Sequence, residues 1–401
     1  MESTVRAVGR RRALLGLVAA LAGVGPLQAA RAEEIKVGLL SQFSGVYSWW
    51  GVEYQRGVDL WLAQNGGGKV GAHTLKVVNR DEGGANPQRA RQLAQELVVS
   101  ERVQYLIGGA FTPTVLGAAD VINQAKVPYV ICNSGTSSVT NKSPYYVRVG
   151  FTQWSVSVPL VKYAVEQGSK NAAVVVADYA PGADALEAFG KTYKSLGGTV
   201  VGEVRVPMGT TDFSTYLQRV RDLKADTVFM FMPLGPMSVG FIKAFKDREL
   251  DKAGLQLMAT NEAAESDLPA VGDAALGLVT ALHYSPFLDN PTNKAFVAAY
   301  KAKFGADALP SIASLAAYDG MRVVAEMVKA TDGKADGDKA MAAAKQMKWD
   351  SPRGPVSIDP KTREIVQNVY IRKVQKFGNQ LGNKEFKTFT AVKDPWHEQN
   401  P

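Results

Sequence analysis

Residues 74–107, TLKVVNRDEGGANPQRARQLAQELVVSERVQYLI, contain two strand-like runs with an amphipathic helix between them. The runs 74–79 and 103–107 are rich in β-branched and other apolar residues, as is typical of buried strands. Between them, Pro87 follows Asn86 at the expected first turn of a helix. The apolar residues then recur with the period of one buried helix face, at Ala90, Leu93, Ala94, Leu97 and Val98. This segment is therefore a predicted β-α-β unit.

The same alternation of strands and helices continues along the chain in both directions. Several further runs are apolar at successive positions, as expected when helices cover both faces of a parallel sheet. These runs are 35–40, 127–131, 172–177, 226–232 and 278–282. The predicted fold class is therefore α/β, with doubly wound parallel sheets.

The series of strands and helices restarts partway along the chain, which predicts two lobes. It restarts near Ala172, after an aromatic, proline-containing passage at 144–154. A similar passage at 283–287 precedes the helical run 293–330, and Arg353-Gly354-Pro355 precedes a strand-like run at 365–374. These three passages are candidate crossings that would hinge the lobes around a cleft. We expect lobe 1 to comprise 33–152 and 284–355, and lobe 2 to comprise 153–283 and 356–401.

The first 32 residues are a predicted signal peptide. Three arginines at 10–12 precede an uncharged stretch at 13–30, and cleavage is expected after Ala32, before Glu33. Glycines and a proline interrupt the apolar stretch, so it is too short for a membrane anchor of about 20 residues. We expect a freely diffusing monomer in the periplasm. The order Arg-Arg-Ala-Leu-Leu at 11–15 also resembles a twin-arginine signal, so both that route and the general secretory route stay open.

Composition and motifs argue against nucleic-acid binding and catalysis. Without residues 1–32 the chain has 41 basic and 37 acidic residues, a formal charge of +4, which gives no case for nucleic acid. The three histidines have no metal-ligand neighbours at suitable spacing, and GxSxG, phosphate-loop and GxGxxG motifs are missing. Cys132 is the only cysteine and is expected to pack in the core. We therefore expect no catalytic residue, no metal and no cofactor.

Ligands of parallel α/β sheets bind at the carboxyl ends of the strands, where the following helices present free backbone N–H groups. The first candidate is residues 108–114, GGAFTPT, directly after a predicted strand. Thr112 fits a helix N-cap and Pro113 the first helical position. The amides of Thr114 and Val115 and two hydroxyls would then be free to meet a carboxylate. An ordinary glycine turn with a capped helix is the alternative.

A second polar segment follows the next predicted strand. Residues 133–138, NSGTSS, place hydroxyls and a glycine after the run 127–131. If the two strands are neighbours, Ser134 and Thr136 lie beside the first site and complete one polar wall. Serine and threonine are also common turn formers, which is the alternative interpretation.

Aromatic residues gather at positions predicted to face the cleft. Aromatic walls bury flat or aliphatic ligands well, although some of these residues are expected to be core or closure contacts. Trp154 and Tyr179 are favoured because a crossing and a strand-end loop are unusual places for core residues. The full set is Tyr47, Trp49, Trp50, Phe111, Trp154 and Tyr179.

The order of several motifs resembles the type I periplasmic solute-binding proteins of ABC importers, in the branched-chain amino acid (leucine/isoleucine/valine) binding group. The matching stretches are IKVGLLSQFSGVYSWWG, GVDLWLAQNGGGKVGAHTLKVVNRDEGGANPQRA, VQYLIGG, TDFSTYLQRVRDLKADTVFMF, YSPFLDNP and AAYDGMRVVAEMVKA. The resemblance covers essentially the whole chain after residue 32. It implies a two-lobed protein that closes on its ligand by hinge bending and delivers it unaltered to a membrane permease.

The resemblance also implies positions for the ligand contacts. The family's carboxylate site falls on 112–114 and 134–136, and its second-lobe aromatic falls on the loop 178–182, at Tyr179 or Pro181. The acid that holds an amino acid's ammonium falls on Asn261 or Glu262; if Asn261 occupies the place, the amino-acid assignment fails.

The expected function is extracytoplasmic binding of a small carboxylate, either an amino acid or an aromatic acid, for an ABC importer. The alternative is a ligand-sensing receptor or regulator of the same fold, and an enzyme on a doubly wound fold is less favoured.

Overall fold

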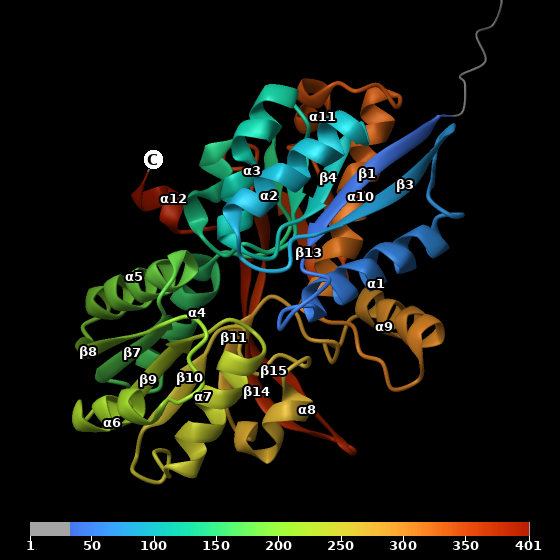
Figure 1. The fold of residues 1–401 in the computed structure, drawn as a ribbon. Coiled ribbons are helices and arrows are strands. Elements are labelled where there is room, and N and C mark those ends of the chain that lie inside the picture. The colour runs from blue at the N-terminus through green and yellow to red at the C-terminus, as the bar shows by residue number, and fades with distance from the viewer. Residues whose placement is uncertain (1–32, 401) are drawn as a thin grey trace, which may run out of the picture.

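The structure is a computed structural model that describes residues 33–400. The predicted signal peptide and its export route lie outside these residues. The chain folds into two α/β lobes, each built on its own sheet (Figure 1). We call the part built on the six-stranded sheet the first lobe and the part built on the nine-stranded sheet the second lobe. This confirms the predicted fold class.

The first lobe is centred on a sheet with strand order β2-β3-β1-β4-β5-β6. All neighbouring pairs are parallel except β2 with β3. β1 lies in the middle of the sheet, with Val37 opposite Val77 on one side and Tyr105 on the other. The strands are β1 (Glu34–Ser41), β2 (Lys69–Val70), β3 (His73–Asp81), β4 (Tyr105–Gly108), β5 (Tyr129–Ile131) and β6 (Tyr146–Arg148).

Helices pack closely in pairs on this sheet. A side chain at Gly57 in α1 would collide with the backbone of Ser314 in α10, and one at Gly117 in α3 would collide with Pro87 in α2. Glycine at these two positions therefore permits the close approach of each helix pair. The helices of this lobe are α1 (Trp49–Gln64), α2 (Pro87–Gln95), continued by a π-helical turn (Glu96–Ser100), α3 (Thr112–Ala125), α9 (Pro291–Phe304), α10 (Ile312–Thr331) and α11 (Gly337–Ala344). A 3-10 turn, η2 (Ser137–Lys142), follows β5.

The second lobe is centred on the sheet β12-β13-β14-β11-β10-β9-β7-β8, with β15 paired to β14. Its parallel part runs from β8 to β11, and β14 joins β11 antiparallel. The strands are β7 (Asn171–Ala177), β8 (Thr199–Val206), β9 (Thr227–Phe231), β10 (Gln256–Ala259), β11 (Val279–Leu282), β12 (Lys348–Ser351), β13 (Gly354–Ile358), β14 (Ile365–Phe377) and β15 (Gln380–Val392). The helices are α4 (Gln153–Glu166), α5 (Ala180–Ser195), α6 (Ser214–Asp222), α7 (Pro236–Asp247), α8 (Leu268–Val271) with a 3-10 turn (Gly272–Ala275), and α12 (Trp396–Gln399).

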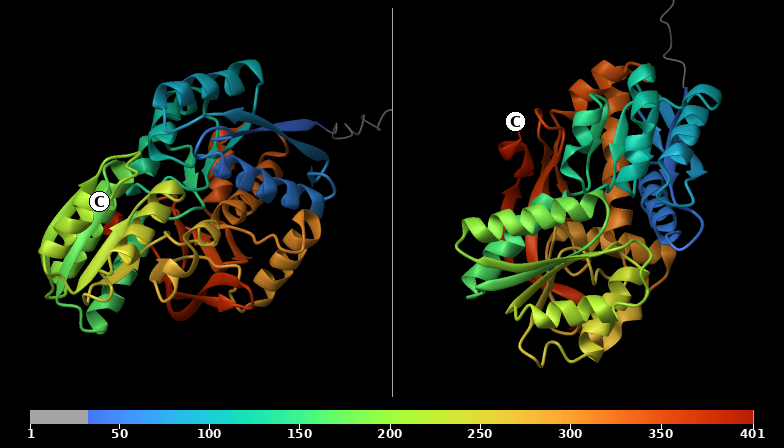
Figure 2. Two further views of the ribbon diagram at one scale, coloured as in Figure 1. Left: turned by 60° about the horizontal axis from the view of Figure 1, so that its bottom comes forward. Right: turned by 60° about the vertical axis from the view of Figure 1, so that its left-hand side comes forward.

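The long strand β14 links the two lobes. Just ahead of it, the Arg363 carbonyl accepts from the amide of Arg148 in β6 of the first lobe (3.0 Å), and the later part of β14 pairs with β11 in the second lobe. β14 and β15, red in Figures 1 and 2, run alongside both lobes. The sequence predicted a strand at 365–374 that returns to the second lobe, and β14 confirms it.

Buried ion pairs hold the segments that connect the lobes. Arg148 at the end of β6 donates to Glu364 (2.8 Å), just before β14. Arg353 pairs with Asp319 of α10 (Nη2 to Oδ2, 3.0 Å) and donates to the carbonyl of Val149 (2.8 Å). Both arginines are fully buried, so their carboxylate and carbonyl partners are needed to offset the loss of hydration.

The described helices include none with the length and apolar character that crossing a bilayer requires.

Candidate ligand-binding site

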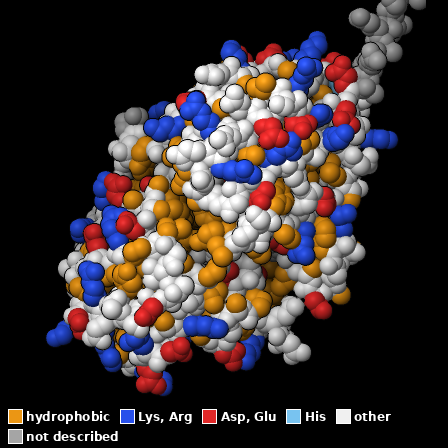
Figure 3. Space-filling model, in the orientation of Figure 1, with side chains coloured by type: hydrophobic (Ala, Val, Ile, Leu, Met, Phe, Trp, Pro, Cys, Tyr) orange, Lys and Arg blue, Asp and Glu red, His pale blue; other side chains and the backbone are white. Residues whose placement is uncertain are grey.

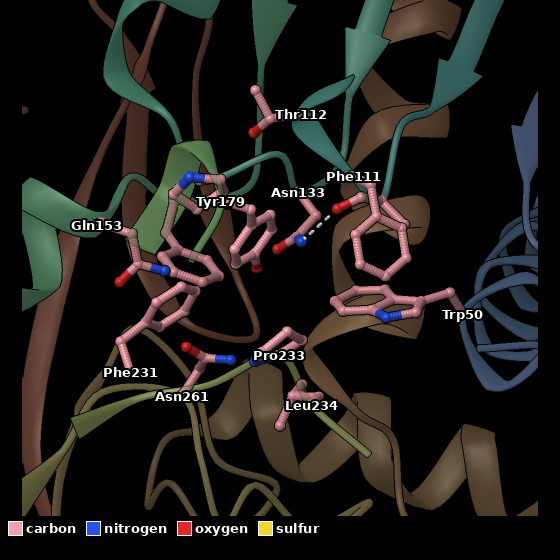
Figure 4. Close-up of a pocket in the computed structure, with 14 residues that line it drawn as sticks. Trp50, Phe111, Thr112, Asn133, Gln153, Tyr179, Phe231, Pro233, Leu234 and Asn261 are labelled. Carbon is pink, nitrogen blue, oxygen red and sulfur yellow. Dashed lines mark hydrogen bonds between the residues drawn. The ribbon is translucent and has the colours of Figure 1, made fainter. Parts of the chain in front are cut away.

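A cavity lies where the strands of both sheets end. Its wall draws on the loops after β4, β5, β7, β9 and β10 and on the first turns of α1, α3 and α4 (Figure 4). On the molecular surface, hydrophobic side chains gather in the hollow between the lobes (Figure 3). The lining residues are Trp50, Ala110, Phe111, Thr112, Asn133, Gly135, Phe151, Gln153, Tyr179, Pro181, Phe231, Pro233, Leu234 and Asn261.

The start of α3 differs from the sequence prediction by one residue. The N-cap is Phe111, with extended backbone (φ −114°, ψ 136°) and no side-chain cap, and Thr112 is already helical. The amides of Thr114 and Val115 donate to the Phe111 carbonyl (3.2 and 3.3 Å). These two amides are therefore not free for a ligand, although the sequence predicted that they would be. Pro113 has no N–H, and the backbone amide of Thr112 has no hydrogen-bond partner within the described residues.

The hydroxyl groups of the predicted site residues form hydrogen bonds mainly with one another and with the backbone. Thr112 Oγ1 donates to Thr136 Oγ1 (3.3 Å), and Thr114 Oγ1 donates to the Phe111 carbonyl (3.0 Å). Ser134, which has a left-handed φ of 57°, donates to the Gly109 carbonyl (2.8 Å). Of these four threonine and serine residues, Thr112 alone is among the residues that line the cavity.

The loop after β5 is positioned by hydrogen bonds to its backbone. The Arg148 guanidinium donates to the carbonyl of Thr136 (2.9 and 3.0 Å) and also to that of Ser134. Asn133 donates through Nδ2 to the Ala110 carbonyl (2.8 Å), the bond drawn in Figure 4. The neighbouring loops after β4 and β5 are thus tied together, as the predicted polar wall required.

Aromatic side chains form much of the cavity wall. Tyr179 stacks on Phe231 of the second lobe, with ring centroids 5.9 Å apart and planes 13° apart. Phe111 meets Trp50 edge to face at 6.5 Å and Tyr47 at 4.9 Å. Burial raises the pKa of the Tyr179 phenol, so this group stays neutral at physiological pH.

Two predicted aromatics lie elsewhere. Trp154 is fully buried in α4, with the Lys191 ammonium 5.9 Å from its ring centroid, and it does not line the cavity. Its helix turns the preceding residue, Gln153, toward the cavity instead. Trp49 borders a separate hollow together with Glu53 and Arg56.

The structure separates the roles of Asn261 and Glu262. The Asn261 side chain lines the cavity. The Glu262 carboxylate is fully buried and accepts hydrogen bonds from the backbone amides of Met232 (2.5 Å) and Thr260 (2.8 Å). Burial raises the pKa of Glu262 to about 8, although these hydrogen bonds oppose the shift. Glu262 therefore braces two loops and does not face the cavity.

Several lining residues were missed from the sequence. Gln153 and Phe151 flank the first crossing, Phe231 is the last residue of β9, and Asn133 and Gly135 lie in the predicted polar segment. The rule that strand ends meet at the ligand pointed to the segment that Asn133 begins, but Phe231 fell inside the predicted strand 226–232, whose actual end is Phe231. The rule could not tell which side chains turn inward.

No acidic or basic side chain is among the 14 residues that line the cavity. In residues 33–400, no three His, Cys, Asp or Glu side chains are grouped so that they could hold a metal ion. Such a cavity suits a flat apolar body with a few polar groups, held by hydrogen bonds and by the amino end of α3.

Comparisons with known proteins agree with this geometry. The model of the periplasmic binding protein family matches residues 34–379. A Leu/Ile/Val-binding protein homolog (homolog 6) of Brucella melitensis is 45% identical over 369 residues, 92% of this chain and 94% of the relative.

Two solved structures are also similar. A solute-binding protein of an ABC transporter from Rhodopseudomonas palustris HaA2, in complex with p-hydroxybenzoic acid, is 47% identical with a TM-score of 0.89, over 92% of this chain and 100% of that one. A second, from Rhodopseudomonas palustris BisB5 in complex with 3,4-dihydroxybenzoic acid, is 42% identical with a TM-score of 0.86, over 91% and 99%. The chain therefore belongs to the periplasmic binding protein family, as a solute-binding component of an ABC importer.

Proposed function

We propose that this protein binds a flat aromatic carboxylate of the hydroxybenzoate class and delivers it to the permease of an ABC importer. The observation that supports this proposal most directly is a cavity walled by aromatic side chains and lined by no charged residue. Aromatic walls favour a planar ring by burial and stacking. The ligands of the two solved relatives support the same chemical class. The walls are Trp50, Phe111, Phe151, Tyr179 and Phe231.

An α-amino acid fits this cavity poorly. Its ammonium would be removed from water with no carboxylate to pair with, which is costly in a buried site. Asn261 occupies the lining position, and the neighbouring Glu262 carboxylate is engaged by Met232 and Thr260. This arrangement favours a ligand without an amino group.

In this proposal the ligand carboxylate lies at the amino end of α3. The Thr112 amide donates to it, and the Thr112 hydroxyl turns from Thr136 Oγ1, to which it donates in the structure, to the ligand. The positive end of the helix dipole adds to the attraction. Thr114, Ser134 and Thr136 support this site by holding Phe111, the loop after β4 and Thr112 in place. Their role is therefore to position the site.

Ligand contacts from both lobes favour the closed state over the open one. The lobes would rotate around the three connections between them, near 152–153, 283–284 and 355–356. One moving body would comprise 33–152 and 284–355, and the other would comprise 153–283 and 356–401. The protein would act as a monomer that has lost residues 1–32 on export, by either secretion route. The arginine-rich, apolar pattern of those residues supports export.

Calorimetric titration of the chain 33–401 tests the proposal. We expect 4-hydroxybenzoate to bind, while leucine and phenylalanine do not. 4-Hydroxybenzamide should bind at least roughly tenfold more weakly, because a neutral amide loses charge-assisted hydrogen bonds. Solution scattering should show a smaller radius of gyration with 4-hydroxybenzoate. Tight binding of leucine, with no binding of any benzoate, would refute the aromatic assignment.

A further inference from the structure

The polar side chains of the cavity fall into two groups that face each other (Figure 4). Thr112 and Asn133 lie at the first-lobe end, where the proposed carboxylate site is. Gln153, the first residue of α4, and Asn261, two residues after β10, lie toward the second lobe. A ligand with its carboxylate at Thr112 would direct the far edge of its ring toward this second group.

Asn261 presents a hydrogen-bond donor to the cavity. Its Oδ1 lies 3.1 Å from the Thr260 hydroxyl, which can donate its one proton either to this oxygen or to Glu262 Oε2 (3.2 Å). Its Nδ2 has no hydrogen-bond partner in the described part of the chain, and Figure 4 shows it directed toward Pro233. An amide nitrogen carries two donors, so at least one of them is available to a ligand.

Gln153 supplies the complementary acceptor. Its backbone amide donates to the Gly135 carbonyl (2.8 Å), and its side chain is almost completely buried against the cavity. Yet its Oε1 has no hydrogen-bond partner within residues 33–400. A buried carbonyl without a partner is unfavourable. Figure 4 shows Nε2 on the side of the cavity and Oε1 turned away from it, and a half-turn of the carboxamide, which exchanges the two atoms with little change in shape, brings Oε1 to face the cavity.

We propose that Gln153 and Asn261 together recognise a hydroxyl group on the far edge of the ligand's ring and so make the site selective for hydroxylated aromatic acids. This inference rests on the proposed function. A phenolic hydroxyl donates one hydrogen bond and accepts another. It donates to Gln153 Oε1 and accepts from Asn261 Nδ2. A plain ring edge does neither and leaves both carboxamides unpaired.

Selectivity follows from this pairing because sites built to hydrogen-bond a hydroxyl reject the analogue that lacks it. We expect the wild-type chain to bind 4-hydroxybenzoate more tightly than benzoate by roughly tenfold to a hundredfold. 4-Aminobenzoate, which donates well but accepts poorly, should fall between them because it satisfies Gln153 alone.

The test is the ratio of the dissociation constants of benzoate and 4-hydroxybenzoate, measured by calorimetry. Gln153→Met and Asn261→Leu keep side-chain size while removing the polar atoms. Each should lower the ratio severalfold, mainly by weakening 4-hydroxybenzoate. Asn261→Leu should also bring 4-aminobenzoate level with 4-hydroxybenzoate, whereas Gln153→Met should remove the advantage of 4-aminobenzoate over benzoate.

A matched control is Phe111→Leu, which alters the apolar wall and should weaken all three ligands alike. Thermal melting of each variant checks that the fold is intact. Unchanged ratios in both carboxamide variants would overturn this inference and leave the proposed function standing. Failure of the wild type to bind any of the three benzoates would overturn both.

Discussion

The carboxylate of Asp184 accepts a hydrogen bond from the backbone amide of Ser137, at 2.8 Å. Asp184 lies on α5 of the second lobe, and Ser137 begins η2 of the first lobe. The bond therefore spans the two lobes beside the cavity, and it can form only when they are close together. Burial raises the pKa of Asp184 to about 6; the Ser137 amide and Arg148 oppose this rise, and Asp394 and Glu187 add to it.

This contact predicts that ligand binding depends on pH. The pKa of Asp184 is raised in the closed arrangement, so closure favours the protonated carboxyl. The stabilisation of the closed state is fully present below the ordinary pKa of 3.8 and is lost as pH rises through about 6. We expect the affinity for 4-hydroxybenzoate to fall severalfold between pH 5 and pH 7.5, since each pKa unit corresponds to about a factor of ten.

Asp184→Asn is the matched variant for this prediction. The asparagine oxygen still accepts from the Ser137 amide, but no buried charge forms at high pH. Binding by the variant should be flatter over the same pH range and tighter than wild type at pH 7.5. Titration calorimetry at several pH values measures both effects. A variant with the wild-type pH profile would show that Asp184 is not the group responsible.

Thr112→Val should weaken binding of 4-hydroxybenzoate by roughly tenfold to a hundredfold, because hydrogen bonds to a charged group contribute about 1.5–3 kcal/mol. Valine keeps the shape of threonine, so the melting temperature should change little. Thr136→Val removes only the hydroxyl partner of Thr112 and should have a smaller effect. Wild-type affinity in Thr112→Val would place the carboxylate elsewhere in the cavity.

The sequence predicted the central strands well because they are short, apolar and buried on both faces. Strands β8 and β15 escaped prediction for the opposite reason. β8 contains Gly202, Glu203 and Arg205 and lies at the edge of its sheet, and β15 carries charged residues on a partly exposed hairpin. Their apolar periodicity is weak because solvent covers part of each strand.

The sequence could not predict which side chains of the strand-end loops point into the cavity. Asn261 and Glu262 are adjacent in sequence, yet one lines the cavity and the other binds backbone amides behind it. Likewise, Trp154 is core while Gln153 faces the cavity. The start of α3 shifted because Phe111 serves as N-cap through its extended backbone alone, which a rule based on capping side chains does not detect.

Tyr179→Ala should weaken binding of 4-hydroxybenzoate by at least roughly tenfold, because it removes a large aromatic surface from the wall. Tyr179→Phe keeps the ring that stacks on Phe231 and should stay within a few-fold of wild type. Quenching of tryptophan fluorescence, or calorimetry, measures the difference. Equal losses in both variants would mean that the phenol, and not the ring face, makes the contact.

The buried pair of Asp319 and Arg353 gives a prediction about stability. Asp319 forms an ion pair with Arg353 (3.0 Å), and both members of the pair are fully buried. Asp319 also accepts hydrogen bonds from Trp349 (2.9 Å) and Ser351 (2.7 Å). Asp319→Asn leaves the Arg353 charge without its counter-ion, which should lower the free energy of unfolding by about 3–5 kcal/mol.

Asp273→Asn, which breaks an exposed pair with Lys376 at 3.4 Å, is the control and should cost less than about 1 kcal/mol. Urea denaturation followed by fluorescence compares the two variants. The loss of unfolding free energy is obtained from the shift of the urea midpoint, provided that the dependence of the free energy on urea concentration is unchanged. The contrast arises because water solvates Lys376 when its partner is removed, whereas Arg353 has no access to water. Equal midpoints for the two variants would therefore mean that Arg353 regains hydration, by local opening of the connecting segments near Val149.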